Sequence, residues 1–135
     1  MAKTYEVELG GRSRPLRYTR EERREIEARF NTDMRSFLYE SCFPLAADGK
    51  PTMGGRLECQ EALLFYGLRH NGPKITEAWV AEHLQKLVAE GGSIYKPLSQ
   101  AIIAVVASGL LGWMPQIKDD VPEEAEEGKA EAVTT

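Results

Sequence analysis

Two cysteines and two histidines are the residues whose types could bind a zinc ion. Cys42 and Cys59 lie 17 positions apart, and His70 and His83 lie 13 apart. Structural zinc sites usually take their ligands in close pairs such as Cys-x-x-Cys or His-x3-His. No such pair occurs, so we predict no metal site. We interpret His70 as the end of a helix, near the negative end of its dipole, and the cysteines as core residues.

Other catalytic patterns are also missing from the sequence. The glycine pairs in "GGRLE" (residues 54–58) and "EGGS" (residues 90–93) lack the lysine and the preceding strand of a phosphate-binding loop. There is no Gly-x-Ser-x-Gly motif, and no local pattern supports a Ser–His or Cys–His pair. We therefore predict a protein that is not an enzyme, with no catalytic residues and no cofactor.

The charge is unevenly distributed. Two lysines and seven acidic residues give residues 114–135 a formal charge of −5, which leaves +1 of the total −4 for residues 1–113. An acidic, alanine-rich segment with few large apolar residues is typical of disorder. We expect one domain over residues 1–113 and a disordered acidic tail over residues 114–135.

Six arginines near the N-terminus could form a basic surface. They are Arg12, Arg14, Arg17, Arg20, Arg23 and Arg24. Such a cluster could contact nucleic acid, pair with an acidic partner or hold the chain's own acidic tail. The alternative is a solvated face, neutralised in part by Glu21, Glu22 and Glu25. We favour the solvated face, because nucleic-acid-binding domains usually carry a strong positive charge and this body is almost neutral.

The elements that would position these residues can be inferred from periodicity. Residues 4–9 alternate as a strand does, Gly10-Gly11 favours a hairpin turn, and Leu16 and Tyr18 point inward from a second strand. Pro15 restricts that strand to an edge or a bulge. The expected helices are Arg20–Phe30, Asp33–Cys42, Arg56–His70, a helix capped by Thr76, and Pro97–Leu111, with a loop over residues 44–55.

The stretch "ALLFYGLRHNGPKITEAWV", residues 62–80, predicts the centre of the core. Its first helix is apolar on almost every side, as buried helices are. Asn71-Gly72 predicts a left-handed C-cap, and Pro73 prevents continuation. Thr76 opens the next helix, with Ile75 and Val80 placed as a hydrophobic staple. The fold class predicted is mainly α, a small helical bundle with an N-terminal β-hairpin.

No segment predicts a membrane span. The most apolar run, Ala101–Trp113, is 13 residues long, whereas a bilayer requires about 20. We interpret this run as a buried core helix. The N-terminal residues lack the apolar segment of a signal peptide, so we expect a cytoplasmic protein with reduced thiols.

Two stretches resemble the tail assembly chaperones of long-tailed phages and gene transfer agents. These are "ALLFYGLRHNGPKITEAWVAEHL" and "YEVELGGRSRPLRYTREERREIEARF", and the resemblance extends over about residues 5–113. It implies a protein that binds and solubilises the tape measure protein in the host cytoplasm and is absent from the mature virion. The major tail tube protein would be a second candidate partner, and we also expect self-association.

Excess apolar helical surface in a small domain indicates a protein partner. The predicted partner-binding residues are Leu64, Phe65, Leu68, Trp79 and Leu84. Two alternatives stay open: a structural tail component, such as a tube or connector subunit that remains in the virion, and a small nucleic-acid-binding regulator that uses the arginine cluster.

Overall fold

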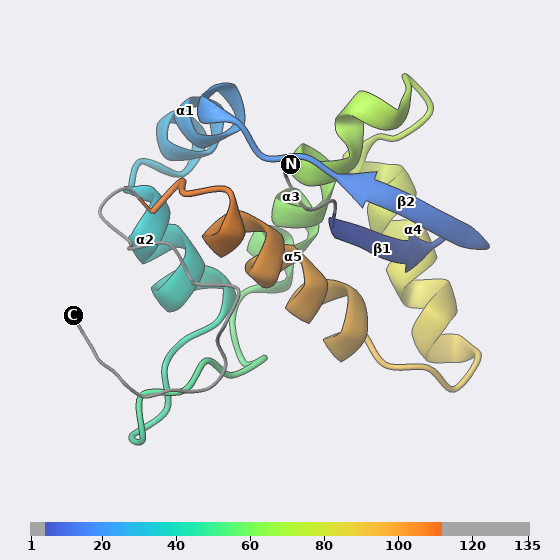
Figure 1. The fold of residues 1–135 in the computed structure, drawn as a ribbon. Helices are drawn as coiled ribbons and strands as arrows, with labels where there is room; N and C mark the ends of the chain where they lie inside the picture. Colours follow the sequence, from blue (N-terminus) through green and yellow to red (C-terminus); the bar gives the residue numbers. More distant parts are fainter. Residues whose placement is uncertain (1–4, 112–135) are drawn as a thin grey trace.

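The structure is a computed structural model that describes residues 5–111, and Figure 1 shows its elements. They are β1 (Tyr5–Leu9), β2 (Arg12–Leu16), α1 (Arg20–Phe30), α2 (Met34–Ser36), the π-helical η1 (Phe37–Cys42), α3 (Leu57–Leu68), the 3-10 turn η2 (Arg69–Asn71), α4 (Glu77–Ala89) and α5 (Tyr95–Ala107). The predicted fold class, mainly α with an N-terminal β-hairpin, is confirmed. The acidic segment 114–135 lies outside the described residues.

The hairpin forms as its sequence predicts. β1 and β2 pair antiparallel, with Val7 opposite Arg14 and Leu9 opposite Arg12. The turn needs Gly10 and Gly11, because both have positive φ (69° and 87°). Two strands alone are barely stable in water. Here β1 packs on α5 and β2 packs on α3, so the helices supply the missing support.

Helix α1 begins and ends where the sequence indicates. The Thr19 hydroxyl accepts a hydrogen bond from the Glu21 amide, and the Glu22 carboxylate accepts one from the Thr19 amide at 2.8 Å, which completes a capping box. Asn31 ends the helix in the left-handed conformation (φ 54°, ψ 48°).

The next predicted helix, Asp33–Cys42, forms as α2 followed directly by η1, and Asp33 caps it by accepting from the Ser36 amide at 2.9 Å.

Helix α3 is the centre of the core. Eight of its twelve residues are buried, and Leu63, Leu64 and Leu68 are completely so. It packs against η1, α4, α5 and β2, which explains why it carries apolar residues on nearly every side.

The break after α3 differs in detail from the prediction. Helix α3 continues directly into the 3-10 turn η2, and no residue in the left-handed conformation caps it. Gly72 has φ 137° and ψ 164°, an extended conformation open to glycine, so it reverses the chain without a helical cap. The Asn71 side chain holds the turn, because its Nδ2 donates to the Leu68 carbonyl at 2.9 Å.

Helix α4 has the predicted N-terminus. The Thr76 hydroxyl accepts from the Trp79 amide at 3.1 Å, and the flanking Ile75 and Val80 are both buried, as a hydrophobic staple requires. The Thr76→Ala substitution should therefore lower the free energy of unfolding by about 1 kcal/mol. Urea unfolding would measure it. The Thr76→Ser variant keeps the acceptor and should lose much less, and equal losses for the two variants would contradict the capping role.

Helix α5 begins two residues earlier than predicted, at Tyr95, and ends at Ala107. Pro97 is its third residue instead of its first. That position is tolerated because the first amides of a helix have no intrahelical partner, so a missing N–H removes no bond. Within residues 5–111, no helix is both long and apolar enough to cross a bilayer.

Candidate partner-binding surface

The outer face of α5 exposes two large apolar side chains. Its inner side buries Leu98, Ala101 and Val105. On the opposite side Tyr95 is 60% exposed and Ile103 is 51% exposed, although both are large and apolar. The sequence carries no charged residue from Pro97 to Leu111. In a helix that is apolar on both sides, folding buries one side and leaves the other exposed to water.

We define the α5 outer face by the residues that share the side of Tyr95 and Ile103. They are Tyr95, Lys96, Ser99, Ile102, Ile103, Val106 and Ala107, of which only Lys96 is charged. Ile102 and Val106 are half-buried against the core and form the floor of this face. Figure 1 shows α5 in the foreground, crossing the molecule from the α4 side toward α2.

One polar group beside this face has no partner. Gln100 Oε1 is buried, and it is the only such side-chain atom of residues 5–111 that makes no hydrogen bond. Buried polar atoms are nearly always paired, so an unpaired acceptor needs an explanation.

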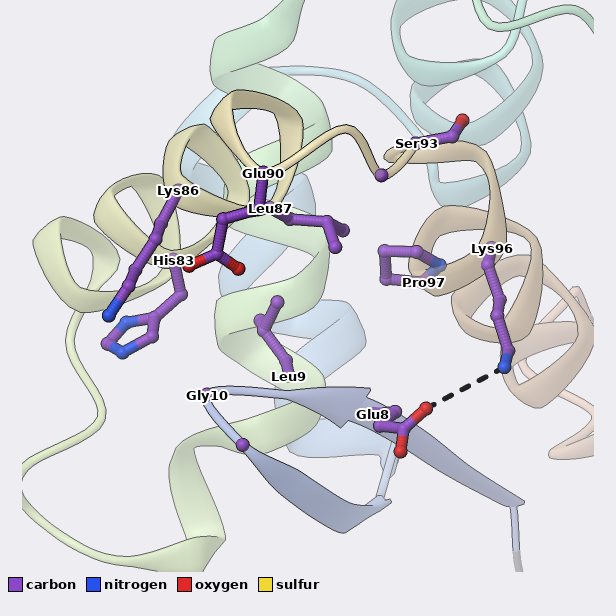
Figure 2. A pocket seen from close by; sticks show the side chains of 12 residues that line it. Glu8, Leu9, Gly10, His83, Lys86, Leu87, Glu90, Ser93, Lys96 and Pro97 are labelled. Carbon is purple, nitrogen blue, oxygen red and sulfur yellow. Dashed lines mark ion pairs between the residues drawn. The ribbon is translucent and has the colours of Figure 1, made fainter.

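A groove adjoins the N-terminal end of α5. It has a volume of about 770 Å³ and lies between the hairpin, α4 and α5. Figure 2 shows the apolar side chains of Leu9, Leu87 and Pro97 facing its interior. Its rim carries charges of both signs, and Lys96 Nζ lies 3.7 Å from the Glu8 carboxylate. From α5, Lys96 and Pro97 line this groove, and the exposed Tyr95 and Ile103 do not.

The structure places most of the five predicted partner-binding residues in the core. Leu64 and Leu68 are completely buried and Leu84 is 2% exposed, so these three cannot contact a partner in this fold. Phe65 and Trp79 are half-buried. The Trp79 ring packs between the Arg14 guanidinium, 4.8 Å from its centroid, and the His83 ring at 4.1 Å. These residues were predicted from their apolar character, which does not distinguish a core residue from a partner-binding residue, because burial and binding favour the same residue types.

The residues of the α5 outer face were missed for a related reason. The run Ala101–Trp113 was interpreted as a buried core helix, but Ile103 is half exposed. The signal that could have found the face is the long charge-free stretch combined with apolar residues on two sides of one helix. A helix at the surface of a small domain normally carries charges on its outer side.

The structure does not bring the two cysteines and two histidines together in one cluster. Cys42 and Cys59 are free and buried, and burial raises the pKa of both thiols. No cluster of three or more metal-ligating side chains exists among residues 5–111. His83 Nδ1 lies 2.9 Å from the Trp79 carbonyl, a local contact within α4. The interpretation of the cysteines as core residues agrees with these positions.

Of the arginine cluster, Arg23 pairs with Glu27 at 3.1 Å, but Glu22 and Glu25 do not pair with the cluster. Glu22 and Glu25 instead pair with Arg69, more than 40 positions away: Arg69 Nη2 donates to Glu22 at 2.9 Å, and Nη1 donates to Glu25 at 2.7 Å. Burial raises the pKa of Glu22, but hydrogen bonds from Thr19 and Arg69 outweigh it and hold the pKa below its ordinary value. Arg69 also lowers the pKa of Glu25, chiefly through its hydrogen bond. This pairing joins α1 to the end of α3.

Removing Arg69 should therefore destabilise the fold in a pH-dependent way. In Arg69→Met the Glu22 side chain, which is 11% exposed, loses its cation, and we expect the free energy of unfolding at neutral pH to fall by about 2 kcal/mol. Because the folded state lowers the pKa of these carboxyl groups, their ionised forms stabilise the protein at pH values above the ordinary pKa of 4.5. This stabilisation is lost as the pH falls through their pKa values in the folded state. The difference between wild type and variant should therefore shrink by about pH 3.

Urea unfolding at the two pH values would test this, with Arg56→Met as the matched control. Arg56 pairs with Glu58 at 3.0 Å, but both side chains are more than half exposed. An exposed pair contributes about 0–1 kcal/mol. Equal losses in the two variants, or a difference that does not depend on pH, would contradict a stabilising role for the Arg69 pairs.

Comparisons of the chain with protein-family models, with curated proteins and with solved structures found no significant match.

Proposed function

We propose that this protein is a tail assembly chaperone that binds the tape measure protein while a phage tail is being built, and that it catalyses no reaction. The observation that supports the proposal most is the α5 outer face, which exposes Tyr95 and Ile103 and carries no charged residue after Lys96. The likeness of residues 5–113 to that family, described above, supplies the partner's identity. A tape measure protein is long and helical, with apolar stripes that stay uncovered until the tube surrounds it.

The dimensions of the face suit such a partner. A helix of 13 residues is about 20 Å long, so the α5 outer face covers about four turns of a helix laid along it. Each copy covers a short section of a long partner, and several copies would be needed to keep it soluble. A small apolar contact also leaves each copy weakly held, which allows the tube to displace it.

The alternative of a structural tail component fits the fold less well. Tube walls are built from β-sheets, and within residues 5–111 the single sheet is the two-stranded hairpin. The alternative of a nucleic-acid-binding regulator lacks the expected charge, because residues 1–113 carry a formal charge of only +1.

Co-expression tests the proposal. We expect the tape measure protein of the same phage to stay soluble and to co-purify with this chain, and to aggregate when produced alone. Mass spectrometry of purified virions should find no stoichiometric amount of this chain. Recovery of the chain from virions in fixed proportion to the tube protein would instead establish a structural tail component. A tape measure protein that neither binds the chain nor depends on it for solubility would refute the chaperone proposal.

A further inference from the structure

A second hollow, lined with positive charge, lies beside β2 and the first turn of α4 and shares no lining residue with the groove of Figure 2. It has a volume of about 380 Å³. Its lining comes from β2, from the chain reversal after η2 and from the first turn of α4. The residues are Arg12, Arg14, Asn71, Gly72, Pro73, Lys74, Ile75 and Trp79. We call it the basic hollow, because three of these side chains are cationic and none is acidic.

The cations of the basic hollow have no anionic partner within the described residues. None of the ion pairs of residues 5–111 includes Arg12, Arg14 or Lys74. Arg14 is held in place, because its Nε donates to the Leu9 carbonyl at 3.0 Å and its guanidinium lies over the Trp79 ring. Burial and the neighbouring Arg12 both lower the pKa of Arg14, as expected for a cation beside a like charge.

The sequence contains a segment of opposite charge that can reach this hollow. Residues 119–131 hold seven carboxylates and one lysine. Asp119 is eight positions beyond Leu111, the last described residue, and Glu131 is 20 beyond it. At about 3.3–3.6 Å per residue, the connecting chain can extend roughly 27–70 Å. A domain of this size has a radius of gyration of about 13 Å, so the later carboxylates of the segment can reach points on the surface far from Leu111.

We propose that the acidic segment 119–131 binds in the basic hollow of its own chain, with its carboxylates paired to Arg12, Arg14 and Lys74. Each contact between exposed charges is weak. The covalent connection compensates, because a tethered segment has an effective concentration in the millimolar range. Charge complementarity therefore gives the hollow an internal ligand, and the arginine cluster a role other than binding nucleic acid.

Paramagnetic relaxation in the full chain tests this contact. A nitroxide attached at Ala125→Cys would react there selectively, because Cys42 and Cys59 are buried. We expect broadening of the amide resonances of residues 12–14 and 71–79, and much less in α1 and α2. Raising the salt from about 0.02 M to about 0.5 M should reduce the broadening by roughly threefold or more, since it shortens the screening length.

Two charge-reversed variants of equal net charge distinguish binding in the basic hollow from nonspecific electrostatic attraction between the acidic segment and the rest of the chain. Arg12→Glu with Lys74→Glu should abolish the localised broadening, whereas Arg24→Glu with Lys50→Glu should preserve it. All four positions are exposed, so the fold should persist, and the amide spectrum reports it. Broadening that is spread over the whole surface, centred on the α5 outer face, or equal in the two variants would overturn the proposal. Binding of a single-stranded oligonucleotide that depends on Arg12 and Lys74, without localised broadening from the tail, would also overturn it.

Discussion

Replacing Gly67 with alanine should lower the free energy of unfolding by about 3 kcal/mol, although the same change in an isolated helix would stabilise it. Alanine is favoured over glycine within a helix by about 1 kcal/mol. In this fold a Cβ at Gly67 would overlap the ring of the buried Tyr18. The ring cannot move freely, because its hydroxyl donates to the Leu63 carbonyl at 2.7 Å. Overpacking of this kind usually costs about 1–3 kcal/mol, and the displaced hydrogen bond adds to it.

The sign of the effect decides between helix propensity and packing. Urea unfolding of Gly67→Ala gives the change, and Tyr18→Phe, which removes only the hydroxyl, gives the contribution of the hydrogen bond. The double substitution Gly67→Ala with Tyr18→Leu frees space beside α3 and should recover part of the loss relative to the sum of the single changes. A stabilised Gly67→Ala variant would mean that Tyr18 does not pack on α3 as described.

The Ile103→Glu substitution should weaken binding of the tape measure protein by about a hundredfold, or about 2.8 kcal/mol, while leaving the fold intact. Ile103 is 51% exposed, so a glutamate there remains hydrated in the free protein. When an apolar helix covers the α5 outer face, the carboxylate must lose water without gaining a partner, which is strongly unfavourable. Surface plasmon resonance with a purified tape measure segment would give the affinity.

Leu45→Glu is the matched control for this experiment. Leu45 has the same exposed fraction, 51%, but it lies in the loop between η1 and α3 and is not part of the α5 outer face. Its replacement makes the same chemical change at another exposed leucine-sized position, so binding should be nearly unchanged. If both variants bound as weakly as each other, or if Ile103→Glu bound normally, the α5 outer face would not be the binding surface.

Local signals in the sequence predicted the elements well. Thr19 with Glu22, and Thr76 with its apolar neighbours, are short-range patterns whose physics is contained within a few residues, and both caps formed as expected. The hairpin followed from strict alternation and Gly10-Gly11. The central position of α3 followed from its apolar residues on all sides. For each of these predictions it was enough to know which residues are close together in the sequence.

Long-range relations could not be predicted in the same way. The pairing of Arg69 with Glu22 and Glu25 depends on how α1 meets the end of α3, which no local pattern records. The change from α2 to the π-helical η1 is likewise not marked by the periodicity, which predicted one helix over Asp33–Cys42. Periodicity identified α5 as apolar, but it could not tell which helices enclose it. Helix α5 packs on α3 and β1 with one side only, and the side that stays exposed follows from these tertiary contacts.

Calorimetric titration of a tape measure segment into this chain, at low and at high salt, tests the central claim most directly. Burial of an apolar helix on the α5 outer face predicts a negative heat-capacity change on binding. It also predicts an affinity that is kept or increased at about 1 M NaCl, because apolar contacts are not screened as exposed charges are. No binding, or an affinity that disappears with salt and shows no heat-capacity change, would contradict the claim that this protein holds its partner by apolar helical contact.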